Sequence, residues 1–179
     1  MAANTPSPDD GKLNPKLPIS NSEEYNVFRD SLVRYLGYAN EVGESFRYQF
    51  PRFIVPSYAV AFGYCLADAV TSGRGAYESA KQAQKPTATA ESIVSTADTL
   101  IWQSLASVCI PGLAINQIVK ASRFAVARSP AGVPVAVTTW LPTTMGLGSI
   151  PLIIHPIDYF VDVLMDNSFR KVPWISYFS

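Results

Sequence analysis

The sequence predicts an all-α membrane protein, a multi-pass helical bundle with about three spans and an N-terminal amphipathic helix. Charged residues make up only 16% of the chain, against roughly 25% in typical soluble domains. Three long uncharged stretches separate them: 15 positions over 53–67, 21 over 99–119 and 29 over 129–157. A helix needs about 20 mostly apolar residues to cross a hydrocarbon core of about 30 Å.

The interior of a soluble helical domain is the alternative explanation for these stretches. Two features favour the membrane. The stretches have aromatic or basic residues near their ends, such as Arg52, Trp102 and Trp140, which is typical of membrane interfaces. They are also rich in Gly, Ser, Ala and Pro, residues that let spanning helices approach closely or bend.

The predicted domain organisation is simple. Residues 1–20 form an extended polar tail, residues 21–173 a single α-helical membrane domain, and residues 174–179 a C-terminal tail. An amphipathic helix of about 25 residues begins at Asn21 or Ser22, with Glu41 and Glu44 on its polar face. We expect this helix to lie in the membrane interface or to pack on the mouth of the bundle.

The spans are expected at about 53–70, 97–119 and 137–155. In the first, the small residues Ala59, Gly63 and Ala67 predict a stripe that faces a neighbouring helix. Residues 71–97 read as a polar loop with a short helix near 76–84. In the second span, the Pro111-Gly112 pair is expected to break or kink the helix.

The third apolar stretch is longer than one straight crossing requires, and it contains five prolines. We interpret it as one bent span followed by a helix from Ile157 to about Phe169. A re-entrant or double-pass arrangement is the alternative.

A basic connector follows the second span, with Lys120, Arg123 and Arg128. Such a cluster predicts binding to anionic lipid head groups, with cardiolipin the candidate. With three spans, nine basic residues lie on the side of the N-terminal part and this connector, and five on the other. This bias places the nine on the matrix side and the C-terminus in the intermembrane space.

Asp158, Asp162 and Asp166 recur every fourth residue, and Arg170 follows at the same spacing. The simplest interpretation is a polar helix face that ends with an Asp166–Arg170 ion pair. Two more specific interpretations are a pair of catalytic carboxylates and an acidic docking face for a protein partner. Asp68 and Asp98 near span ends are candidates for an ion path, and the alternative is that they cap helices or pair with arginines across the bundle.

The sequence contains no motif that is typical of an enzyme active site. His155 is the single histidine and has no metal-ligating partner at the right spacing. Cys65 and Cys109 fit neither a disulfide framework nor a metal site. There is no phosphate-binding glycine loop or dinucleotide fingerprint. Balanced charge gives no indication of nucleic acid. We therefore expect no catalysis, no cofactor and no metal.

Four motifs carry a resemblance to a known family. They are RYLGYANEVGESFR (34–47), YCLADAV (64–70), DTLIWQSLASVCIPGLAIN (98–116) and GLGSIPLIIHPIDYFVDVLMDNSFRK (146–171). In this order they resemble the mitochondrial fission process protein family, also called the mitochondrial 18 kDa protein. The resemblance implies a multi-pass α-helical protein of the mitochondrial inner membrane, linked to mitochondrial division and without catalytic activity.

The leading functional hypothesis is thus a non-enzymatic inner-membrane protein that acts in fission and membrane organisation through contacts with lipids and other proteins. The alternative is a structural accessory subunit of a large inner-membrane assembly, such as a respiratory complex or ATP synthase. A carrier or channel ranks third, because no inverted repeat is visible.

Overall fold

The computed structural model describes residues 36–128 and 133–171, and these residues form helices and turns without a strand. The predicted all-α class is confirmed. Three helical segments are long and apolar enough to cross a membrane: Pro51–Gln82, Ala88–Ala127 and Val135–Lys171. The two predicted tails and most of the predicted amphipathic helix lie outside the described residues.

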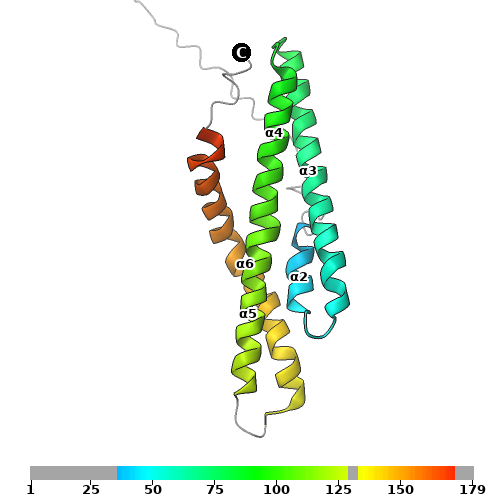
Figure 1. Ribbon diagram of the computed structural model, residues 1–179, viewed down its shortest axis with the longest axis vertical. Helices are drawn as coiled ribbons and strands as arrows, with labels where there is room; N and C mark the ends of the chain where they lie inside the picture. The colour runs from blue at the N-terminus through cyan, green and yellow to red at the C-terminus, as the bar shows by residue number, and fades with distance from the viewer. Residues whose placement is uncertain (1–35, 129–132, 172–179) are drawn as a thin grey trace, which may run out of the picture.

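One long helix forms the axis of the molecule (Figure 1). It consists of α4 (Ala88–Gln103), a π-helical segment η3 (Ser104–Cys109) and α5 (Ile110–Ala127). At 1.5 Å per residue, its 40 residues extend about 60 Å, roughly twice the hydrocarbon thickness of a bilayer. Part of this helix therefore projects beyond the hydrocarbon core.

The other elements pack along this axis. The helix α3 (Ile54–Gln82) lies beside α4, and α6 (Val135–Asn167) lies beside α5. The short helix α2 (Ala39–Ser45) contacts α3, α5 and α6. Two single turns of 3-10 helix, η2 (Pro51–Phe53) and η4 (Phe169–Lys171), precede α3 and follow α6.

The α3–α4 hairpin is longer than predicted. The expectation of a polar loop over 71–97 is wrong, because α3 continues to Gln82 and α4 already begins at Ala88. Gly73 is buried, and a Cβ at this position would collide with Thr96 on α4. The missing side chain lets the two helices stay in contact beyond the apolar stretch. Polar residues there are compatible with a helix that has left the hydrocarbon core.

The helix α3 buries a stripe of small residues, but not the stripe that the sequence predicted. Ala59, Gly63 and Ala67 all face outward, so that expectation is wrong. Ala61, Cys65 and Ala69 are fully buried instead. Both sets repeat at every fourth position, and their spacing alone does not distinguish the inward from the outward face.

Pro111 does not break the second span. The helix runs through it, because the π-helical segment η3 precedes the proline directly and Pro111 stands in the first turn of α5. A proline in the first turn loses no hydrogen bond that the turn requires. A proline inside a regular α-helix usually kinks or breaks it. Here the wider π turn before Pro111 accommodates the proline, and the helix continues.

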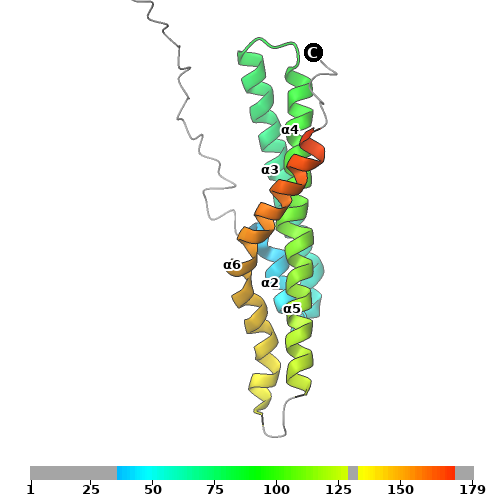
Figure 2. The same ribbon diagram turned by 90° about the vertical axis from the view of Figure 1, so that its left-hand side faces the viewer.

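The third stretch forms the single helix α6, with Pro142, Pro151 and Pro156 inside it. Figure 2 shows that α6 changes direction near its middle and crosses over the central helix. One continuous, bent helix thus covers both segments expected over 137–169, with no double pass.

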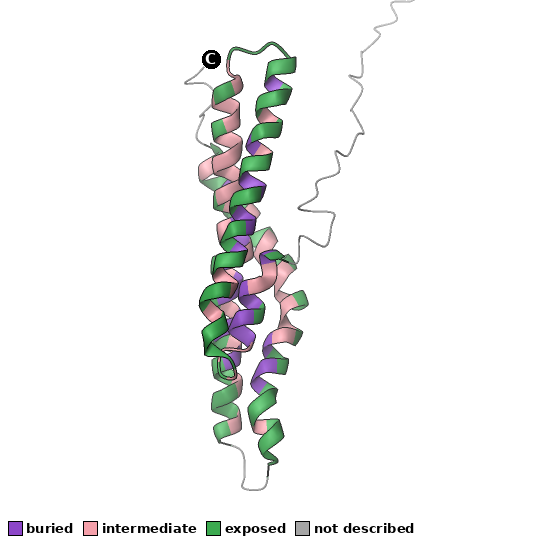
Figure 3. Ribbon diagram, turned by 90° about the vertical axis from the view of Figure 1, so that its right-hand side faces the viewer, coloured by how far each residue is buried: buried purple, intermediate pink, exposed green. Residues whose placement is uncertain are grey.

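Many large apolar side chains of the described residues are exposed, and Figure 3 shows exposed positions along every long helix. Val55, Leu113 and Leu152 are 77%, 64% and 75% exposed. Only 11% of the most apolar part of α6 is buried. Among the described residues, the interior contains eleven buried hydrophobic residues and also eight buried polar or charged ones: Asn40, Glu41, Glu44, Ser45, Asp68, Gln103, Asn116 and Thr143. This distribution suits a surface in contact with lipid tails.

Gly146 provides a test of the packing of α6. A Cβ there would lie 2.7 Å from Ser45 Oγ on α2 and 2.8 Å from Val119 Cγ2 on α5, whereas a Cβ at Gly148 meets nothing within 4 Å. We expect Gly146→Ala to destabilise the protein by about 1–3 kcal/mol through overpacking. Gly148→Ala should be neutral or slightly stabilising. Thermal unfolding in mild detergent measures both, and equal transitions for the two variants would contradict the packing described.

Candidate functional site

The face that α2 turns to the bundle is polar. Asn40, Glu41, Glu44 and Ser45 are at most 1% exposed, whereas Val42 is 42% exposed. The sequence prediction placed Glu41 and Glu44 on the outer, polar face of the helix, and the structure reverses it. The reversal follows from the surroundings, because the groove that receives α2 is lined by polar groups of α3 and α5.

Glu44 is the centre of the contacts made by α2. Its carboxylate accepts two hydrogen bonds from Arg47, at 2.6 and 2.7 Å. It also accepts one from Tyr58 Oη on α3 at 3.1 Å and one from Asn116 Nδ2 on α5 at 2.8 Å. We call these four residues the Glu44 hub. Through the hub, one carboxylate connects α2 to α3 and α5, two of its three long neighbours.

The hub also sets the charge state of Glu44, which lies outside the three candidate spans. Burial alone would raise the pKa of this carboxyl, but the hydrogen bonds from Arg47, Asn116 and Tyr58 outweigh it. The net result is a pKa below the ordinary value. Glu44 is therefore a paired carboxylate, and one turn away Asn40 donates to the carbonyl of Val108 at 3.1 Å.

Glu41 lies on the same helix in the opposite state. It is fully buried, and neither of its carboxylate oxygens has a hydrogen-bond partner among the described residues. Burial raises its pKa from the ordinary 4.5 to about 8. Because the charged form would be both desolvated and unpaired, Glu41 is mainly protonated at neutral pH.

A second polar feature is a cleft of about 420 Å³ at the level where α6 crosses α4. We call it the acidic cleft, because its lining includes four acids and one basic side chain: Asp68, Asp98, Asp158, Asp162 and Arg170. The aromatic side chains of Tyr38, Tyr64 and Trp102 also line it. The predicted acidic series of α6 is thus partly a wall of this cleft.

Arg170 closes one side of the acidic cleft. Its guanidinium donates to both oxygens of Asp98 on α4, at 2.9 and 3.0 Å. It also reaches Asp166 at 2.9 Å and Asp162 at 3.4 Å on α6. The expected Asp166–Arg170 pair is confirmed, and so is the pairing of Asp98 with an arginine across the bundle. A docking role for Asp158, Asp162 and Asp166 stays a prediction.

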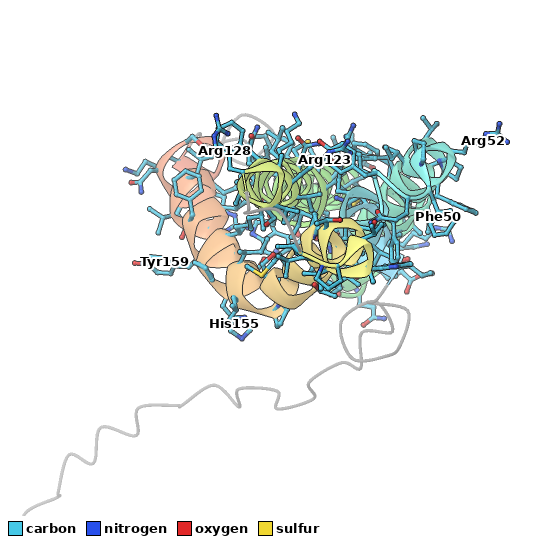
Figure 4. All side chains as sticks on the ribbon, turned by 90° about the horizontal axis from the view of Figure 1, so that it is seen from below. Phe50, Arg52, Arg123, Arg128, His155 and Tyr159 are labelled. Carbon is cyan, nitrogen blue, oxygen red and sulfur yellow. The ribbon has the colours of Figure 1, made fainter. Side chains whose placement is uncertain are left out.

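The basic connector lies near the end of α5, at the end of the molecule opposite the α3–α4 hairpin (Figure 1). Lys120, Arg123 and Arg128 are all exposed. The Arg123 guanidinium carbon stands 4.0 Å from the ring centre of Tyr48, and that of Arg128 stands 3.3 Å from the ring centre of Phe124. Figure 4 shows both arginines along the same edge, away from His155 and Tyr159. Aromatic contacts thus support both guanidinium groups. We call the surface formed by Lys120, Arg123 and Arg128 the basic edge.

Arg123 also borders a hollow of about 380 Å³. Its polar lining comes from the turn after α2 and from the start of α6, with Tyr48, Gln49, Thr138 and Thr139. Gln49 donates to the carbonyl of Thr139 at 2.6 Å and ties the two segments together. The arrangement offers one cation and several hydroxyl groups to an anionic ligand.

The structure brings together residues that the sequence did not connect. Trp102 Nε1 donates to Asp162 at 2.8 Å, and Gln103 Nε2 donates to Asp68 at 2.6 Å. These partners are 60 and 35 positions apart in the chain, so no local spacing predicts them. Among the described residues, no group of three or more His, Cys, Asp and Glu side chains fits a metal ion.

These features define the class: an all-α, multi-pass membrane protein with a partly polar interior, an acidic cleft where α6 crosses α4 and a basic edge near the end of α5. Comparison with known sequences gives the family. The chain belongs to the mitochondrial 18 kDa protein family, whose profile matches residues 25–165. The family predicted from the sequence motifs is confirmed.

The relatives are similar over nearly their whole length. The human mitochondrial fission process protein 1 is 46% identical over 158 residues, which cover 87% of this chain and 92% of the relative. The zebrafish (Danio rerio) protein of that name is 44% identical, with coverage of 86% and 92%. The Caenorhabditis elegans protein is 39% identical, with coverage of 87% and 93%. No solved structure is a significant match.

The comparisons support a mitochondrial protein with a role in fission, as the names of its relatives indicate. The names describe a cellular process and no reaction. The expectation that this chain is not an enzyme therefore stays a prediction.

Removal of the Glu44 carboxylate should loosen α2 from the bundle. Glu44→Ala leaves Arg47 and Asn116 without their shared acceptor, and we expect a loss of about 3–5 kcal/mol in the free energy of unfolding. Glu78→Ala, at an exposed position of α3, is the matched control and should change stability little. Chemical unfolding in mild detergent compares the two, and similar losses would show that the hub does not hold α2.

The raised pKa of Glu41 predicts a pH dependence. The folded state holds this proton more tightly than the unfolded chain, so stability falls as the pH rises from about 4.5 to about 8. The difference between the limits is on the order of 5 kcal/mol. Glu41→Gln should flatten the stability profile over this range, with Glu78→Gln as the control. A variant profile parallel to the wild type would refute the assignment.

Proposed function

We propose that this chain is an integral protein of the mitochondrial inner membrane that acts in mitochondrial fission through contacts with lipids and other proteins, without catalysis of its own. The observation that carries the proposal is the outward apolar surface of three helices in a family named for fission. A soluble protein with such a surface would aggregate.

The outward surface supports lipid contact on every long helix. Phe50 and Phe53, at the turn into α3, are 49% and 62% exposed, and their rings meet edge to face with centres 6.0 Å apart. Figure 4 shows Phe50 at the periphery of the molecule, beside Arg52. Aromatic and basic residues placed together are typical of the interfacial region of a bilayer.

The basic edge supports a more specific lipid contact. Arg123 adjoins a hollow lined by hydroxyl groups, and Lys120 and Arg128 lie within about one turn or two of it on the same helix. A doubly charged phospholipid such as cardiolipin offers two phosphates to such a cluster. We therefore include cardiolipin among the proposed partners, on the matrix side that the basic-residue count favours.

The basic edge leads to a direct prediction. In mild detergent, added cardiolipin should raise the unfolding temperature of the wild type through preferential binding to the folded state. Substitution of Lys120, Arg123 and Arg128 by Gln should remove most of this shift. The control carries Gln at Arg74, Lys81 and Lys85, which lie on the α3–α4 hairpin at the opposite end, and should keep it. Equal shifts in the two variants would reject the basic edge as the lipid site.

The cellular proposal is tested by deletion and rescue. Loss of a fission factor should lengthen the mitochondrial network, and the full chain should restore it. Protease protection of a C-terminal tag in mitochondria and in mitoplasts locates the membrane and the orientation. An unchanged network, together with stoichiometric co-purification with a respiratory complex or ATP synthase, would instead identify an accessory subunit.

A further inference from the structure

Among the described residues that line the acidic cleft, four are acids and one, Arg170, is a cation. Asp98 and Asp162 are both bonded to Arg170, the cation that the described part of the lining contains. Arg170 also pairs with Asp166, outside the cleft lining. The single guanidinium therefore already serves three carboxylates, and Asp68 is not among them.

Asp68 is bonded to no cation among the described residues. It is 2% exposed, and its Oδ2 accepts a hydrogen bond from Gln103 Nε2 at 2.6 Å. Its Oδ1 has no partner among the described residues. An amide donor leaves the carboxylate charge in place, and a buried charge without a counter-charge is costly. The buried carboxylate of Asp68 therefore lacks a counter-charge among the described residues.

The neighbours of Asp68 determine which donor reaches its carboxylate. Gln103 Oε1 accepts from Ser107 Oγ at 2.6 Å, which directs the amide NH₂ toward Asp68. Ser107 belongs to η3. Interruptions of an α-helix by a π-turn occur frequently at functional sites. The irregular turn therefore places a hydroxyl that fixes the orientation of Gln103, and through it the accepting side of Asp68.

The walls of the cleft favour an organic cation over a metal ion. Tyr38, Tyr64 and Trp102 line it, and aromatic faces attract ammonium groups. No described cluster of acids meets the geometry of a metal site. The volume of about 420 Å³ lies in the range of small-molecule pockets.

We propose that the acidic cleft binds a small organic amine, whose protonated nitrogen donates to Asp68 while its carbon chain lies against the aromatic walls. Binding forms charge-assisted hydrogen bonds and no covalent bond. The assignment is independent of the role in fission and of the basic edge, which lies at the other end of the molecule.

Calorimetric titration of the full-length protein in mild detergent tests the assignment, with cadaverine as the probe. We expect cadaverine to bind, and pentanediol, its uncharged counterpart, not to bind. Asp68→Asn keeps the shape of the side chain and removes its charge, so affinity should fall about tenfold or more. Asp166→Asn removes one charge outside the cleft lining and should change affinity less than about threefold.

Three results would overturn the proposal. These are an absence of cadaverine binding to the wild type, equal losses in Asp68→Asn and Asp166→Asn, and Mg²⁺ binding that Asp68→Asn abolishes while cadaverine binding persists. Circular dichroism shows whether the variants fold. If Asp68→Asn does not fold, Asp158→Asn in the cleft lining decides, because it should weaken cadaverine binding more than Asp166→Asn does, and an effect no larger than that of the control refutes the site.

Discussion

A single buried carboxylate, Glu44, holds the short helix α2 among three long ones. Its four hydrogen bonds come from α3, α5 and the turn after α2. A charge in a weakly polar interior is stable only when it is paired and fully bonded. This requirement fixes the position and rotation of α2, and with them the turn into α3 and the contact with α6 at Gly146.

The same constraint explains the distribution of the remaining polar groups. Polar side chains that cannot reach water turn inward and bond one another, as Asp68 and Gln103 do. Apolar side chains such as Leu152 turn outward. The interior therefore combines small apolar clusters with polar contacts between close-packed helices, and small residues such as Gly73 and Gly146 allow the approach.

The sequence predicted the three long helices well, because uncharged stretches of sufficient length depend on composition alone. It also predicted the Asp166–Arg170 pair, because an i,i+4 spacing is local. The orientation of α2 was not predictable in this way. An amphipathic pattern shows that a helix has two faces, but which one is buried depends on whether water, lipid or polar groups surround it. The same holds for the two small-residue stripes of α3.

The acidic cleft escaped prediction for a different reason. Asp68, Asp98 and Arg170 come from three elements, and their meeting depends on the bend of α6, which the prolines permit without specifying its direction. Likewise, Pro111 indicates a disturbance in the second span but not its form. The π-helical segment resolves that disturbance without a break.

The most direct test of this account is the surroundings of the outward apolar side chains. Spin labels at Val55, Leu113 and Leu152, on the three long helices of a variant without Cys65 and Cys109, report access to oxygen and to a water-soluble nickel chelate in reconstituted bilayers. The account predicts high oxygen and low chelate access at all three positions. High chelate access at these positions would show that water surrounds the helices and would contradict the membrane-embedded bundle.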